Sequence, residues 1–190
     1  AKTLGCFGDG GAVVTNDDNI ASYIRQLRDH GRDTNGKVTI WGHNGRLDNL
    51  HASILNYKLT ELTKYILRRR EIAKIYNELL SPLNNILLPP PPDESPLRFD
   101  VFQNYEIQLD FRDDLRNYLL ENGVGTIMQW GGWMVHQFDD LILKHQCPYA
   151  EKMSKRMILL PMNHFLSDDE VVYISKLILN FFYKKGLHHG

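Results

Sequence analysis

Cysteine is scarce in this sequence, and other features that mark particular protein classes are absent. Cys6 and Cys147 are the only two cysteines and lie far apart, so we expect no disulfide framework and a reducing, cytoplasmic environment. No apolar run is long enough to span a bilayer, and no apolar signal segment opens the sequence. The formal net charge of −1 gives no general attraction to nucleic acid or anionic lipid. The sequence therefore predicts neither a membrane nor a nucleic-acid partner.

Hydrophobic patterning predicts a strand and two helices in the first half of the chain. The β-branched residues of Gly10–Thr15 favour a short strand. Asn16 or Asp17 can cap a helix that ends near Gly31. Apolar residues then recur at three- and four-residue steps from Arg46 to Leu80, which predicts one long helix. A helix of that length usually crosses between two domains or kinks midway.

The second half alternates predicted strands and helices after a stiff, proline-rich linker at 87–96. Ser167 and Glu170 form a capping box at the start of the last helix. The predicted elements are strands over 101–109 and 124–130 and helices over 112–123, 151–157 and 167–183. This half is therefore expected to be an α+β domain.

A cluster of four glycines between residues 5 and 11 first suggests a phosphate-binding loop. The nearby Lys2 precedes the glycines instead of following them, and Val13 stands where a dinucleotide motif has its third glycine. A strand is expected next, whereas both phosphate motifs lead into a helix. The residues alone favour a tight turn with positive φ.

Three further motifs leave alternatives open. The eight histidines lack metal-site spacing and are interpreted as structural or surface residues. Arg68–Arg70 is interpreted as a solvated or interdomain face. The Trp130–Trp133 stretch, with two glycines between two tryptophans, is either aromatic packing around a turn or a loop whose rings stack on a sugar or base.

Five segments stand in one order along nearly the whole chain: AKTLGCFGDGGAVVTND, LRDHG, GHNGRLDNLHASIL, VHQF and LPMNHFLSDDEV. Together they resemble the DegT/DnrJ/EryC1/StrS family of pyridoxal-phosphate-dependent sugar aminotransferases. The resemblance implies an α/β fold, the C-terminal part of a fold-type I transferase. It divides the chain into the end of a large cofactor domain with a long linking helix (1–80), a linker (81–97) and a small α+β domain (98–190).

The same resemblance implies a catalytic lysine. In the family, a P-x-K-x-L-G-x-x-G-D-G-G stretch carries the lysine that forms a Schiff base with pyridoxal 5'-phosphate, and Lys2 stands at that position. A lysine that attacks an aldehyde must be deprotonated, and its free amine can then carry a proton between substrate and cofactor. The implied reaction transfers an amino group from glutamate to a nucleotide-linked keto sugar in amino-sugar biosynthesis.

Four further residues carry over from the family motifs. Asn44 matches an asparagine that reaches the cofactor phosphate of the other subunit, and Arg46 is expected to order that loop and contribute to the substrate site. His136 matches the histidine of a C-terminal substrate loop, although the proline and leucine that commonly precede it are replaced here. Trp130, in the neighbouring QWGGW stretch, is assigned to the same substrate site. Asn44 and His136 could instead be ordinary turn and loop residues.

The family's preceding half, which carries most cofactor ligands, is not in this sequence. We therefore expect a C-terminal portion that is inactive alone and associates as a homodimer or higher homo-oligomer. One alternative is a cofactor-free remnant that only self-associates or binds a partner. Another is a related dehydration or deoxygenation reaction, against which the presence of Lys2 argues.

Overall fold

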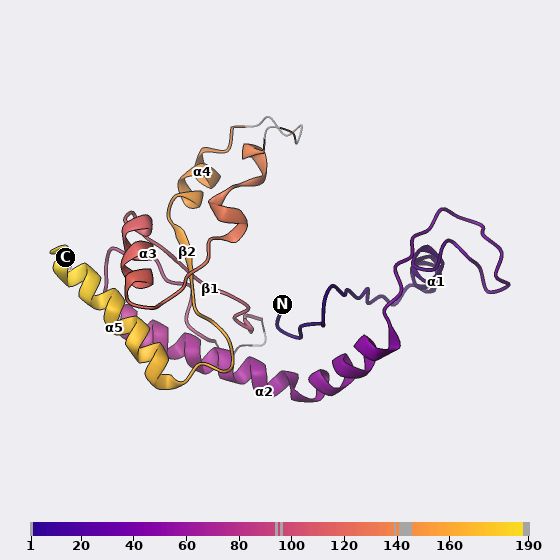
Figure 1. Ribbon diagram of the computed structural model, residues 1–190, viewed down its shortest axis with the longest axis horizontal. Coiled ribbons are helices and arrows are strands. Elements are labelled where there is room, and N and C mark those ends of the chain that lie inside the picture. The colour runs from indigo at the N-terminus through magenta and orange to yellow at the C-terminus, as the bar shows by residue number, and fades with distance from the viewer. Residues whose placement is uncertain (1, 94, 96, 139, 141–145, 188–190) are drawn as a thin grey trace. The chain divides into compact units, whose positions relative to one another are not determined.

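The computed structural model describes residues 2–93, 95, 97–138, 140 and 146–187, and the chain divides into two compact units, 1–63 and 64–190 (Figure 1). Helix α2 (Asn49–Leu80) contains the boundary between them, so the predicted long helix is confirmed and begins three residues later than expected. None of the described helices is both long and apolar enough to cross a bilayer. The boundaries 1–80, 81–97 and 98–190 stay a prediction.

The first unit contains helix α1 (Asp18–Leu27) and the N-terminal part of α2. Asp17 caps α1 as expected, because its carboxylate accepts hydrogen bonds from the backbone N–H groups of Asn19 and Ile20. Only Gly5 and Gly31 are buried among the described residues of this unit. The unit therefore has no hydrophobic core of its own.

The predicted strand at Gly10–Thr15 is wrong. The segment has no regular structure, and the side chain of Val14 is 95% exposed. β-Branched residues favour a strand only where a neighbouring strand completes the hydrogen-bond ladder. The described residues place no such neighbour beside this segment.

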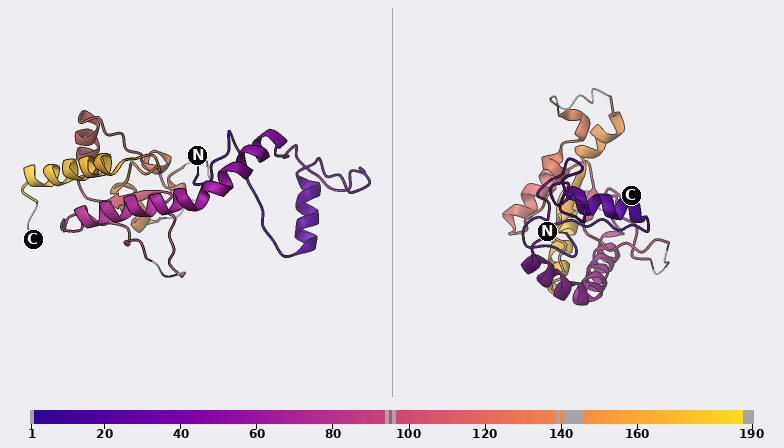
Figure 2. Two further views of the ribbon diagram at one scale, coloured as in Figure 1. Left: turned by 90° about the horizontal axis from the view of Figure 1, so that it is seen from below. Right: turned by 90° about the vertical axis from the view of Figure 1, so that its right-hand side faces the viewer.

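The second unit is built around an antiparallel pair of short strands, β1 (Tyr105–Gln108) and β2 (Met157–Leu160). Its other elements are helices α3 (Arg112–Glu121), α4 (Pro148–Ser154) and α5 (Asp168–Lys184) and the 3-10 turns η1 (Gln129–Gly132) and η2 (Val135–Gln137). Helix α5 lies alongside the C-terminal part of α2 in each view (Figure 1, Figure 2). Both helices contribute to one core cluster with the strands, and its central members are Ile72, Tyr76, Ile107, Ile158, Ile178 and Phe182. This unit therefore has the core that the first unit lacks.

Most predicted elements of the second unit are confirmed, including the capping box that begins α5. The predicted strand over 124–130 is wrong. Only a single bridge joins Ile127 to Leu159, because Trp130 (φ 51°) and Gly131 (φ 67°) leave the extended conformation at once. The predicted helix at 151–157 begins earlier, at Pro148, since proline suits a first helical turn, and Met157 belongs to β2.

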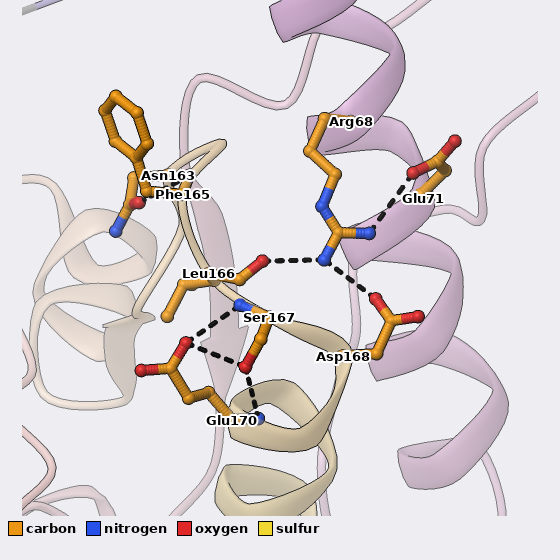
Figure 3. Close-up of polar contacts among 8 residues, drawn as sticks. All are labelled: Arg68, Glu71, Asn163, Phe165, Leu166, Ser167, Asp168 and Glu170. Atoms are coloured by element: carbon orange, nitrogen blue, oxygen red, sulfur yellow. Dashed lines mark hydrogen bonds and ion pairs between the residues drawn. The ribbon is translucent and has the colours of Figure 1, made fainter.

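Arg68 joins α2 to the beginning of α5 (Figure 3). Its Nη2 donates to the Leu166 carbonyl at 2.6 Å and lies 2.7 Å from the Asp168 carboxylate, while Nη1 bonds Glu71 at 3.2 Å. Asp168 and Glu71 remain largely exposed, so solvent screens these ion pairs.

Arg69 joins α2 to the two segments that border the strands. Its Nη1 donates to the carbonyls of Phe102, Gln103 and Met162, each at 3.1 Å. Phe102 has a left-handed φ of 47°, which is strained for a side chain of its size. Burial lowers the pKa of Arg69, whose charge is solvated by these carbonyls.

Arg70 fastens the segment after the prolines. It donates to the carbonyls of Asp93 and Asp100 at 2.6 and 2.8 Å, and its guanidinium lies 4.0 Å from the Phe99 ring centroid. Arg69 and Arg70 are buried, so of the two expected alternatives, a solvated or an interdomain face, the solvated one is wrong for them. We call Arg68–Arg70 the arginine clamp.

Removing Arg69 should destabilise the second unit more than removing Arg68. Arg69→Met leaves three carbonyls without their donor and should cost about 3 kcal/mol, whereas Arg68→Met breaks partly exposed contacts and should cost about 1 kcal/mol. Urea denaturation followed by circular dichroism measures both values. Equal losses would contradict the role given to Arg69.

Candidate functional site

The predicted site residues lie in both units. Lys2, Asn44 and Arg46 belong to the first unit, and Trp130 and His136 belong to the second. Within the first unit they occupy two loops, one before α1 and one between α1 and α2.

Lys2 is exposed and immediately precedes the expected glycine turn. Gly5 (φ 67°) and Gly8 (φ 76°) adopt left-handed conformations that favour glycine. The ammonium group of Lys58, on α2, donates a hydrogen bond to the Gly5 carbonyl. The turn that carries Lys2 is therefore tied to α2 by its backbone, while the Lys2 amine is accessible.

The loop that carries Asn44 passes over the end of α1 and is joined to it by backbone hydrogen bonds. The His43 N–H donates to Leu27 at 2.7 Å, and the Gly45 N–H donates to Arg28 at 2.8 Å. The crossing needs Gly31, because a Cβ there would lie 1.8 Å from the Ile40 carbonyl oxygen. Asn44 is thus held between two backbone contacts that fix its position on the loop.

The Asn44 side chain is oriented by Arg46. Its Oδ1 accepts a hydrogen bond from Arg46 Nη2 at 3.0 Å, and Arg46 Nη1 lies 3.3 Å from Asp29 Oδ1. An amide whose oxygen is engaged presents its NH₂ group as a donor. Sequence reasoning missed Asp29, although it lies in the quoted LRDHG segment and its backbone bridges to Asn44.

Trp130 lies on a turn seated against a buried arginine. Gly132 (φ 88°) lies close to Arg112 and Ser154. A Cβ at this position would be 3.7 Å from Arg112 Nη1 and 3.6 Å from the Ser154 carbonyl oxygen. Arg112 donates to that same carbonyl at 3.1 Å. Trp130 is 81% exposed, so its ring face is accessible; Trp133 is 54% exposed and lies beside the Phe138 ring.

His136 lies in η2, and its side chain is only 8% exposed. Its Nε2 is buried without a hydrogen bond among the residues that the structure describes. The Glu151 carboxylate on α4 lies 3.5 Å away. Sequence reasoning missed Glu151, which shows no signal before the fold brings α4 beside this turn.

The residues of the first unit fit part of a phosphate-bearing aldehyde cofactor such as pyridoxal 5'-phosphate. Lys2 supplies an accessible primary amine for the aldehyde, and the oriented Asn44 amide supplies a donor for a phosphate oxygen. Within the described ranges, no group of three or more histidine, cysteine or acidic side chains could hold a metal ion.

Substituting Gly31 should loosen the attachment of the Asn44 loop to the end of α1. Gly31→Ala places a methyl group inside the contact distance of the Ile40 carbonyl, so trypsin should cleave after Arg28 and Arg32 at least tenfold faster. Gly36→Ala is the matched control, since Gly36 has a similar φ of 79° but no atom within 4 Å of an added Cβ. Equal cleavage rates in the two variants would show that the crossing does not hold the loop.

Comparison with known proteins gives a consistent set of relatives. The chain is 35% identical over 184 residues to the "Pleiotropic regulatory protein" of Geobacillus stearothermophilus, covering 95% of this chain and 49% of the relative. It is 32% identical over 189 residues to a UDP-2-acetamido-2-deoxy-3-oxo-D-glucuronate aminotransferase of Pseudomonas aeruginosa, with the same coverage. The chain thus spans about half the length of these relatives.

A solved structure confirms the predicted fold class. S. venezuelae DesV in complex with a ketimine intermediate superposes with a TM-score of 0.87 at 29% identity, over 94% of this chain and 48% of that one. The structural relatives are fold-type I enzymes that depend on pyridoxal 5'-phosphate. The sequence model of the family matches residues 1–179, and the chain therefore belongs to the DegT/DnrJ/EryC1/StrS aminotransferase family.

Proposed function

We propose that this chain carries the cofactor lysine and the C-terminal substrate loop of an aminotransferase that acts on a nucleotide-linked keto sugar, with glutamate as amino donor. The observation that carries the proposal is Lys2, an accessible amine before the glycine turn, in a family match that covers residues 1–179. The names of relatives support the substrate class. One is an aminotransferase of a UDP-linked oxo sugar, and another is a dTDP-3-amino-3,4,6-trideoxy-alpha-D-glucose transaminase of Streptomyces venezuelae.

Lys2 would be the catalytic residue. Bound pyridoxal 5'-phosphate supplies an electron sink that stabilises negative charge on the substrate carbon. The Lys2 amine holds the cofactor aldehyde at rest and, once released, moves a proton at Nζ as general base and acid. The glycine turn and its anchor on Lys58 keep the lysine backbone in place during both tasks.

Asn44 and Arg46 would serve the cofactor phosphate. The Asn44 amide N–H groups donate to phosphate oxygens, and Arg46 keeps the amide from rotating. The family resemblance assigns this asparagine to the cofactor of the other subunit. Arg46 also brings positive charge to a loop that would approach a doubly charged phosphate.

Trp130 and His136 would bind the sugar nucleotide. The exposed Trp130 ring suits stacking on a sugar or base, and the turn beneath it packs close to Arg112 at Gly132. His136 offers an imidazole nitrogen for a hydrogen bond to the substrate. Both of these residues belong to the second unit.

The exposed apolar side chains of the first unit support association with a second copy. Val14, Leu50 and Tyr57 are 95, 71 and 69% exposed, and this unit lacks a core. A homodimer would cover such side chains. The same observation favours the second candidate function, a self-associating domain that binds no cofactor.

The absorbance spectrum of the chain with added pyridoxal 5'-phosphate separates the two candidates. We expect the chain to shift the near-ultraviolet and visible absorption of the cofactor away from that of free pyridoxal 5'-phosphate, and Lys2→Ala to abolish that shift, because an imine to this amine absorbs differently from the free aldehyde. Lys37→Ala is the control, since Lys37 is also exposed and lies in a loop of the same unit. A shift that persists in Lys2→Ala would refute the role of Lys2, and the absence of a shift in both proteins would favour the cofactor-free candidate.

A further inference from the structure

The His136 ring is buried, yet one of its nitrogens lacks a hydrogen-bond partner among the described residues. Its side chain is 8% exposed, and Nε2 has no hydrogen bond within the described part of the chain. A buried polar atom without a partner costs free energy, so such atoms are rare in folded proteins. The Glu151 Oε1 atom, 3.5 Å from Nε2, is positioned to supply the partner.

The backbones on both sides of this contact are fixed. Glu151 lies in the first turn of α4, where its N–H donates to Cys147 at 2.9 Å and its carbonyl accepts from the Ser154 hydroxyl at 2.8 Å. On the histidine side, the Gln137 side chain accepts from the Met134 N–H at 2.8 Å and closes the 3-10 turn. The Glu151 side chain is 46% exposed, so a small change in its side-chain torsion angles could shorten the contact. Hydrogen bonds in functional sites are often long before the substrate binds.

We propose that Glu151 is the positioning residue of His136: its carboxylate accepts a hydrogen bond from Nε2–H and so leaves Nδ1 as the nitrogen that meets the ligand. The bond made by one imidazole nitrogen decides which nitrogen carries the proton. In the neutral ring, Nδ1 is then a hydrogen-bond acceptor. Such an acceptor recognises a hydroxyl group of the sugar, a statement that rests on the proposed function.

The tautomer of His136 tests the positioning role without any substrate. Long-range ¹H–¹⁵N spectra of the ¹⁵N-labelled chain, at a pH where the ring is neutral, report which nitrogen carries the proton. We expect the Nε2–H form in the unmodified chain. Glu151→Leu removes the acceptor and leaves a buried N–H unpaired, so the ratio of Nε2–H to Nδ1–H should fall about tenfold.

Two further variants make the result specific. Glu151→Gln retains an oxygen that can accept the hydrogen bond, so it should preserve the Nε2–H form. Glu121→Leu, at the exposed C-terminal end of α3, should leave the tautomer unchanged and controls for loss of a glutamate. An unaltered tautomer in Glu151→Leu overturns the proposal, provided that circular dichroism shows an intact fold. If Glu151→Leu does not fold, Glu151→Ala takes its place: a loss of the Nε2–H form supports the proposal, and its retention overturns it.

A binding measurement tests the ligand side separately, with UDP-N-acetylglucosamine as the probe in titration calorimetry. We expect His136→Ala and Glu151→Leu to weaken binding by a similar factor of about ten, and the double variant to bind no more weakly than either. Additive losses overturn the idea that Glu151 acts through His136. An unmodified chain that does not bind the probe counts against the proposed function, and the tautomer measurement then still decides the positioning role.

Discussion

The arginine clamp on α2 is the contact on which the second unit depends. Three consecutive side chains of one helix donate to carbonyl groups of two other parts of the chain, residues 93–103 and residues 162–166. Arg69 has the greatest reach, because its carbonyl partners border both β1 and β2. It also stabilises the left-handed Phe102, which turns the chain into β1. The Arg69 guanidinium group thus holds the two-stranded sheet against α2 together with the shared core.

The first unit is held together by different forces. Its contacts are local and polar. They are the Asp17 cap of α1, the hydrogen bond from Lys58 to the Gly5 carbonyl, the backbone hydrogen bonds between the Asn44 loop and the end of α1, and the contacts of Arg46 with Asp29 and Asn44. Each of these contributes about 1 kcal/mol or less where water competes for the same groups. The lysine and asparagine assigned to the cofactor lie in this unit, so their arrangement depends on whatever covers its apolar side chains. The substrate residues lie instead on a unit with its own core.

Local sequence signals predicted the elements that need only local partners. The Asp17 cap and the Ser167–Glu170 capping box each involve residues within three positions of one another; the capping box is confirmed, and Asp17 is the one of the two expected cap residues that caps α1. The strands at 10–15 and 124–130 failed because a strand requires a partner far away in sequence. The burial of Arg69 and Arg70 in the arginine clamp was not predicted for the same reason. A run of arginines in the sequence indicates positive charge but not the carbonyl groups, distant in sequence, that accept its hydrogen bonds.

The candidate site residues divide in the same way, into those that a local motif predicts and those that depend on distant contacts. Motif resemblance predicts site roles for Lys2, Asn44, Arg46, Trp130 and His136, because each belongs to a short segment that can be matched directly, and these roles stay predictions. Asp29 and Glu151 were missed, since each acquires its role only when another loop or helix is folded against it. Supporting residues of this kind are found by burial and distance rather than by motif.

The most direct test of the account is amide hydrogen exchange of the 190-residue chain, resolved by mass spectrometry. The account predicts slow exchange in β1, β2, α5 and residues 64–80 of α2, because these elements pack around the core and the arginine clamp and open rarely. It predicts exchange that is faster by orders of magnitude in α1 and in residues 2–17. Comparable protection of α1 and β1 in the chain alone would contradict it, because the first unit would then possess a stability that its exposed side chains do not provide.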